Sequence, residues 1–171
     1  MGDVFSDLST LIGEGSAHQA ISSMTENDMP AFEDIVTPDI KPKKAESDKP
    51  LIVVIDDDFS TLDIMKIYLA RGFTCETFSS PKDAIFYLNN HVPDLIFMDC
   101  YLNMVKTKMM LEIIGSYTEF ETVPIVYICE DDEYGAVKSK LPERVSDLIT
   151  RPVKRGDLQN ILDEVFPKEL M

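Results

Sequence analysis

The chain has 171 residues, enough for one domain with a sizeable hydrophobic core and an additional segment. Its 31 acidic residues outnumber its 16 basic residues and give a formal charge of −15, which argues against direct binding to DNA or RNA. The sequence shows neither a signal peptide nor an apolar run long enough to span a bilayer. Three cysteines without metal-ligand spacing (Cys75, Cys100 and Cys129) indicate a reducing compartment, so a cytoplasmic protein without membrane insertion is predicted.

Residues 1–49 differ in composition from the rest of the chain. They carry several prolines and a mixed-charge run at residues 41–49, which predicts an extension and linker that is largely disordered. Apolar residues with helical spacing occur near its start, at Val4, Phe5, Leu8, Leu11 and Ile12. Two alternatives stay open here: a disordered tail, and a short helix that folds on a partner or on the main domain. The folded domain is expected over residues 50–171.

The most informative stretch is residues 51–58, in which five aliphatic residues run directly into Asp56, Asp57 and Asp58. An uninterrupted apolar run rich in β-branched residues predicts a strand buried on both faces of a parallel sheet. Ligands of such sheets bind beyond the carboxyl ends of the strands, and Mg²⁺ favours a small set of carboxylates. The alternative is an aspartate-rich turn that caps the next helix. Three adjacent carboxylates after a buried strand favour the cation site.

From residue 51 onward, predicted strands and helices alternate. The expected strands lie at residues 51–55, 73–78, 95–99, 124–129 and 147–150. The expected helices lie at about residues 61–72, 81–88, 106–117, 130–141 and 158–165. Ser60 or Thr61 can cap the first helix, which is expected to end at Gly72, and Pro81 suits the first turn of the second. Five such units predict an α/β domain with a doubly wound parallel sheet.

Residues 51 to about 166 resemble the receiver domain of bacterial two-component response regulators. The markers are the acidic cluster after the first strand, Pro93-Asp94 before the third, Pro124 opening the fourth, Arg151-Pro152 closing the fifth, and the spacing from Cys129 to Arg151. The resemblance implies a flavodoxin-like sheet of strand order 2-1-3-4-5 with helices on both faces, so that strands one and three are neighbours. It also implies a signalling domain rather than an enzyme.

The resemblance further implies the roles of individual residues. Asp99 is expected to be the phosphoacceptor, and Mg²⁺ is expected on Asp56, Asp57, Asp99 and the backbone carbonyl of Tyr101. An alternative register, with Asp57 and Asp58 as the acidic pair, stays open. The remaining positions of the predicted catalytic set are Arg151 and Cys129. Arg151 can act as a phosphoryl ligand, as a structural partner of the aspartates, or as both.

Several residues depart from the pattern of the family. Cys129 stands where the family has a Thr or Ser, Arg151 stands in place of a Lys, and Leu148 replaces the aromatic switch residue. Further departures are Asn103 and Thr107 after the acceptor and Arg144-Val145 before the fifth strand. A thiol is a weak hydrogen-bond donor, whereas the guanidinium group of arginine is always charged and presents several N–H donors in a plane. These changes predict either an unusual signalling route or a scaffold that no longer switches.

Two rival functions stay open at this point. The loop at residues 56–60 also resembles the nucleophile loop of haloacid-dehalogenase-type phosphatases, with Asp56 as nucleophile and Asp58 as acid/base. A non-phosphorylated pseudo-receiver that only binds proteins is the second rival. The receiver interpretation implies as partners a sensor histidine kinase or a phosphotransfer protein, together with a downstream protein that carries the output. No direct contact with nucleic acid is expected.

Overall fold

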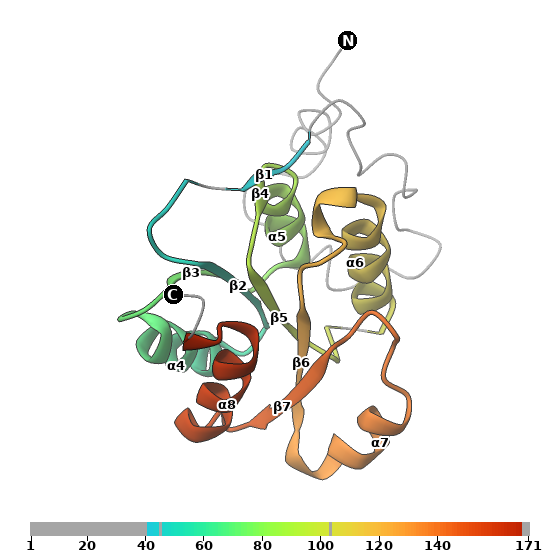
Figure 1. The fold of residues 1–171 in the computed structure, drawn as a ribbon. Coiled ribbons are helices and arrows are strands. Elements are labelled where there is room, and N and C mark those ends of the chain that lie inside the picture. Colours follow the sequence, from blue (N-terminus) through green and yellow to red (C-terminus); the bar gives the residue numbers. More distant parts are fainter. Residues whose placement is uncertain (1–40, 45, 103, 169–171) are drawn as a thin grey trace, which may run out of the picture. The chain divides into compact units, whose positions relative to one another are not determined.

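The computed structural model describes residues 41–44, 46–102 and 104–168 (Figure 1). The possible helix near the start of the chain lies outside these described residues. Five parallel strands form the main sheet in the order β3-β2-β5-β6-β7. Their bounds are β2 (Leu51–Ile55), β3 (Thr74–Phe78), β5 (Leu95–Asp99), β6 (Ile125–Glu130) and β7 (Asp147–Arg151). Counted along the main sheet, this is the predicted 2-1-3-4-5 order, which puts β2 next to β5.

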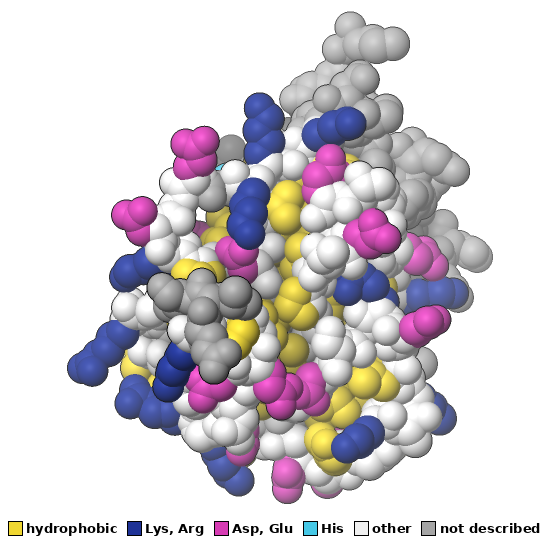
Figure 2. Space-filling model, viewed as in Figure 1, with side chains coloured by type: hydrophobic (Ala, Val, Ile, Leu, Met, Phe, Trp, Pro, Cys, Tyr) yellow, Lys and Arg dark blue, Asp and Glu magenta, His cyan; other side chains and the backbone are white. Residues whose placement is uncertain are grey.

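Helices cover both faces of the sheet. Their bounds are α4 (Phe59–Leu69), α5 (Pro81–Leu88), α6 (Met104–Ser116), α7 (Tyr134–Ser139) and α8 (Arg155–Val165). Figure 1 shows α4 and α8 side by side on one face, with α5 and α6 on the other. Among the described residues, no helix has the length and apolar character needed to cross a membrane. Figure 2 shows acidic and basic side chains interspersed over the visible face, without a continuous basic patch.

The hydrophobic core explains why the strands are nearly continuous apolar runs. All five residues of β2 and all five of β5 are buried. One core cluster joins Ile52 and Val54 of β2 with Leu62 and Met65 of α4 and Leu158 of α8. Alternate strand residues point to opposite faces of a sheet. The residues of β2 that lie outside this cluster therefore pack toward the helices on the opposite face. A strand buried on both faces cannot alternate with polar residues.

The structure corrects the expected ends of the first helix. Its N-cap is Asp58, not Ser60 or Thr61, and Asp58 accepts hydrogen bonds from the backbone N–H groups of both residues, each at 3.1 Å. A carboxylate one position before the helix satisfies two of its unpaired N–H groups at once, so the hydroxyl residues enter the helix. The helix ends at Leu69, with Ala70 as C-cap, rather than at Gly72.

The segment after β6 also differs from expectation. Glu130 extends β6 by one residue, and residues 131–133 form a 3-10 helix instead of continuing one long helix. Only Tyr134–Ser139 is α-helical. Two adjacent aspartates and Gly135 have low helix propensity, and Pro142 cannot continue a helix, which accounts for the fragmentation.

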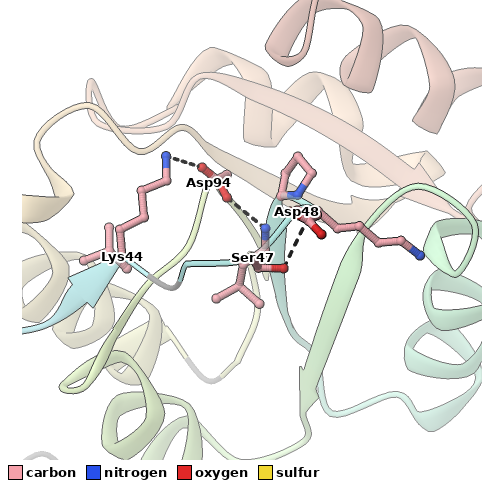
Figure 3. A pocket seen from close by; sticks show the side chains of 8 residues that line it. Lys44, Ser47, Asp48 and Asp94 are labelled. Atoms are coloured by element: carbon pink, nitrogen blue, oxygen red, sulfur yellow. Dashed lines mark hydrogen bonds and ion pairs between the residues drawn. The ribbon is translucent and has the colours of Figure 1, made fainter. Parts of the chain in front are cut away.

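Part of the predicted linker pairs with the domain. Lys43–Lys44 forms strand β1, which pairs in parallel with β4 (His91–Val92). We call residues 41–44 and 46–50 the strap. Asp94 contacts both the strap and the residue that follows it: Oδ1 lies 2.6 Å from Lys44 Nζ, and Oδ2 accepts from the Leu51 N–H at 2.8 Å (Figure 3). A hollow of about 220 Å³ is lined by the strap together with Leu51, Val92 and Asp94.

Candidate functional site

Three carboxylates meet at the C-terminal ends of β2 and β5. Asp56 directly follows β2 and Asp99 is the last residue of β5; the two strands are neighbours in register, with Ile55 paired to Met98. Oxygen atoms of Asp56, Asp57 and Asp99 lie within 4.8 Å of one another. Asp56 and Asp99 are buried, with 0% and 3% of their surface exposed, whereas Asp57 is exposed. The group therefore spans the boundary between core and solvent.

Asp58 lies outside this group because its side chain is occupied by helix α4. Oδ2 accepts from the Thr61 hydroxyl at 2.7 Å and from the Thr61 N–H, and Oδ1 accepts from the Ser60 N–H. The hydrogen bond from the Thr61 side chain is the largest cause that lowers the pKa of Asp58. The described geometry thus favours Asp56 and Asp57 as the acidic pair and gives Asp58 a capping role.

Hydrogen bonds from the backbone fix the two buried carboxylates. The Asp58 N–H donates to Asp56 Oδ1 at 2.8 Å, and the Tyr101 N–H donates to Asp99 Oδ1 at 2.9 Å. Burial raises the pKa of Asp56 to about 6, although Arg151 and the Asp58 N–H act in the opposite direction. Burial also raises the pKa of Asp99. These carboxylates are costly to ionise without a nearby cation.

Arg151, the last residue of β7, reaches across the sheet to the acidic group. Its Nη2 lies 2.6 Å from Asp56 Oδ2 and 3.1 Å from Asp99 Oδ2, and its Nη1 lies 3.0 Å from Glu130 Oε1. Burial lowers the pKa of Arg151, but the hydrogen bond and charge of Asp56, together with Asp99 and Glu130, outweigh it and raise the pKa overall. The guanidinium is therefore a fixed positive charge in the site.

Cys129 is fully buried near the end of β6, and the neighbouring Cys100 has its N–H bound to the Ile128 carbonyl oxygen. Burial is the main cause that raises the pKa of Cys129, and it raises the pKa of Cys100 to about 12. Reactive cysteines need a lowered pKa, because the thiolate is the nucleophile. Both thiols are thus protonated at neutral pH, which fits a small packing residue better than a redox role.

The other predicted positions have structural surroundings of their own. Tyr101 is 44% exposed beside Asp99, and Leu148 is buried on β7, paired with Tyr127. Thr107 donates its hydroxyl to the Cys100 carbonyl oxygen at 3.4 Å. Arg144 donates through Nη2 to the carbonyl oxygens of two residues that precede β6, Phe120 at 2.5 Å and Val123 at 2.8 Å. Arg144 therefore supports the loop before β6. Asn103 lies outside the described residues.

Sequence reasoning missed Glu130, and it gave helix capping by the aspartate-rich turn only as the alternative to a cation site, whereas Asp58 caps α4 and Asp56 and Asp57 join the acidic group. Glu130 is the cross-strand partner of Arg151, since both are the last residues of neighbouring strands. Placing the end of the fourth strand one residue later would have identified the pair. Two buried polar atoms, Arg151 Nε and Glu133 Oε2, have no hydrogen-bond partner among the described residues.

The oxygen atoms of the acidic group match the preference of Mg²⁺. This hard cation binds through one or two carboxylates, keeps several waters and often contacts a phosphate. Two buried carboxylates with raised pKa values and a third at the surface offer oxygen ligands at the boundary between core and solvent. In chemical terms, the site can hold a hard divalent cation beside a carboxylate that is available as a nucleophile.

The strand order, with an acidic site at the carboxyl ends of β2 and β5, defines a flavodoxin-like α/β fold. A sequence model of the response regulator receiver domain matches residues 52–163. The chain therefore belongs to the response regulator receiver family.

Known relatives agree with this family. The two-component response regulators EHD1 of Oryza sativa subsp. indica and ORR30 of subsp. japonica are each 26% identical over 122 residues, which cover 70% of this chain. The matched part spans only 35% of those rice proteins, about a third of their length. These relatives are from a plant, so the resemblance to bacterial response regulators does not by itself indicate a bacterial origin.

Solved structures with the same fold include two bacterial proteins. The chemotaxis response regulator CheY4 of Vibrio cholerae matches with a TM-score of 0.59 and 16% identity, covering 69% of this chain and 99% of that one. The receiver domain of a sensor histidine kinase from Pseudomonas aeruginosa PAO1 matches with a TM-score of 0.59 and 21% identity, covering 68% and 96%. That receiver has a magnesium ion coordinated in its active-site cleft. At these identities, the likeness shows the fold alone.

Proposed function

We propose that this receiver accepts a phosphoryl group on Asp99, with Mg²⁺ held by Asp56, Asp57, Asp99 and the carbonyl of Tyr101. The observation that carries the proposal is the approach of three carboxylates to within 4.8 Å of one another at the ends of adjacent strands. The magnesium site of the Pseudomonas aeruginosa receiver supports the same assignment here. The function is signalling through protein contacts and not turnover of a metabolite.

The reaction is a nucleophilic displacement at phosphorus. An oxygen of Asp99 forms a bond to the phosphorus of the donor, and the bond between phosphorus and the donor's leaving group breaks. Asp56, Asp57 and Asp99 would hold Mg²⁺ beside this carboxylate, where the ion would neutralise negative charge on the phosphoryl oxygens and on the attacking oxygen. The Tyr101 N–H, 2.9 Å from Asp99 Oδ1, fixes the carboxylate, so that Oδ2 is the oxygen better placed to attack. Arg151 is paired with Asp99 Oδ2 in this structure, and its guanidinium is therefore positioned to contact the incoming phosphoryl group.

The proposed donor is a phosphohistidine on a sensor histidine kinase or on a phosphotransfer protein, and the output is the binding of a downstream protein. The names of the rice relatives place them in two-component signalling, which supports this class of donor. We place the protein in the cytoplasm, where such kinases present their phosphohistidine. The formal charge of −15 continues to argue against direct nucleic-acid binding.

The proposed switching relay is weak. Cys129 offers only a poor hydrogen bond to a phosphoryl oxygen, and the buried Leu148 has no ring to reorient. A ligand shifts a conformational equilibrium only by the difference in its contacts with the two states. Phosphorylation of Asp99 should therefore change the surface near α7 and α8 little.

The test is phosphorylation of the full chain by acetyl phosphate with and without Mg²⁺, followed by intact mass. One added phosphoryl group is expected with Mg²⁺ and none with EDTA. Asp99→Asn should abolish the addition, whereas Asp131→Asn, which removes an exposed charge outside the acidic group, should keep it. Absence of any addition in a protein that binds Mg²⁺ would favour the pseudo-receiver scaffold.

The same preparation tests the phosphatase alternative. That mechanism needs Asp58 as acid/base, but both Asp58 oxygens accept hydrogen bonds from the start of α4. We therefore expect no sustained hydrolysis of a simple aryl phosphate. Multiple turnovers that depend on Asp56 and persist in Asp99→Asn would reverse this assignment.

A further inference from the structure

One guanidinium bridges three carboxylates that lie at the C-terminal ends of three different strands. The Nη2 atom of Arg151 contacts Asp56 and Asp99, which belong to the acidic group, and Nη1 contacts Glu130, which does not. Glu130 and Arg151 are paired in the register of β6 and β7, so the sheet itself sets their approach. Glu130 is 52% exposed, whereas the Arg151 side chain is 14% exposed. The ion pair thus joins the buried acidic group to the surface.

We infer that Glu130 is a positioning residue for Arg151 and thereby raises the affinity of the acidic group for Mg²⁺. The inference rests on the proposed function, because it concerns the same cation. Glu130 is a further carboxylate partner for the guanidinium, and it is not one of the proposed metal ligands.

The argument begins with competition for the same carboxylates. Arg151 occupies Oδ2 of both Asp56 and Asp99, and these residues are two of the three carboxylates of the acidic group. Two cations near the same oxygens repel each other, most strongly where water is excluded. An arginine with no other partner would therefore oppose Mg²⁺ binding. An arginine side chain is always protonated in proteins, so its positive charge stays beside the acidic group.

Glu130 relieves this competition in two ways. Its charge offsets the charge of Arg151, so the acidic group keeps its attraction for a divalent cation. The arginine fork can also give two N–H groups to one carboxylate. In the present arrangement Glu130 receives only Nη1, because Nη2 is bound to Asp56 and Asp99. When Mg²⁺ binds to Asp56 and Asp99, the guanidinium can therefore form a second bond to Glu130 and stay paired.

The experiment is a double-mutant cycle on Mg²⁺ affinity, measured by calorimetric titration of the full chain. Glu130→Gln should weaken Mg²⁺ binding about fivefold. The matched control is Asp131→Asn, which removes the same charge at the next residue, where no contact with Arg151 occurs among the described interactions; its effect should stay below about twofold. In the Arg151→Gln background, Glu130→Gln should also change the affinity by less than about twofold.

Melting curves without Mg²⁺ show whether each variant is folded. If Arg151→Gln does not fold, the comparison of Glu130→Gln with Asp131→Asn still tests the inference. If Glu130→Gln and Asp131→Asn weakened Mg²⁺ binding equally, the inference would be overturned, because Glu130 would then act only through its charge and not through Arg151. A full Glu130 effect without Arg151 would overturn it as well. A wild-type protein that binds no Mg²⁺ at millimolar concentration would remove the proposed function and the inference together. Mg²⁺ binding without coupling would remove the inference alone.

Discussion

The raised pKa of Asp56 predicts a pH dependence of stability that one isosteric variant can isolate. In the folded protein, burial raises this pKa from 3.8 to about 6. The folded state therefore binds the proton more tightly than the unfolded state. The stabilisation from protonated Asp56 is complete below pH 3.8 and is lost as pH rises through about 6. Asp56→Asn removes this titration while it keeps the shape of the side chain.

The size of the effect follows from the shift. One pKa unit corresponds to about 1.36 kcal/mol, so the rise from 3.8 to about 6 amounts to about 3 kcal/mol. Without Mg²⁺, the unfolding free energy of the wild type relative to Asp56→Asn should fall by up to that amount between pH 4 and pH 7. Urea unfolding at a series of pH values in EDTA measures the difference.

Millimolar Mg²⁺ should reverse the trend above pH 6, because the cation binds ionised Asp56 in the folded state. A difference between the two proteins that is constant with pH, or that rises with pH in EDTA, would refute the reasoning.

Three further predictions concern the metal, the relay and the strap. Mg²⁺ should raise the melting temperature by relieving carboxylate repulsion, and Asp57→Asn should weaken that response; an unmoved wild-type curve contradicts a metal site. Cys129→Thr should enlarge the beryllofluoride-induced NMR shifts around Leu148 and α8, and large shifts in the wild type would disprove the weak relay. Removal of residues 1–40 should leave the unfolding free energy unchanged, whereas Asp94→Ala should lower it by about 1–3 kcal/mol because the Leu51 N–H loses its acceptor; denaturant melts test both.

The main strands were predictable because their physical cause is local. The run from Leu51 to Ile55 must be buried on both faces, and the same logic applies to residues 95–99. The meeting of Asp56 with Asp99 follows once the sheet order is known, since both end adjacent strands. The sheet order itself came from the family resemblance, because periodicity alone does not arrange strands in space.

Other features depend on competition or on distant contacts that sequence patterns do not display. Asp58, Ser60 and Thr61 are all good capping residues, and only the geometry of the turn selects Asp58. The contact of Arg151 with Asp56 joins residues 95 apart in sequence. Lys43–Lys44 has the composition of a linker, yet it forms a strand because β4 offers an unpaired edge.

The two ends of β5 carry aspartates with different roles. Asp94 holds the strap immediately before the strand, and Asp99 closes the strand at the acidic group. Five residue steps at about 3.3 Å each separate the two carboxylates by about 16 Å along a single strand. The strap is thus anchored at the end of the sheet remote from Asp99, the proposed phosphoacceptor. A fluorescent label or fusion partner attached at the strap would therefore leave the acidic group at the other end of β5 accessible.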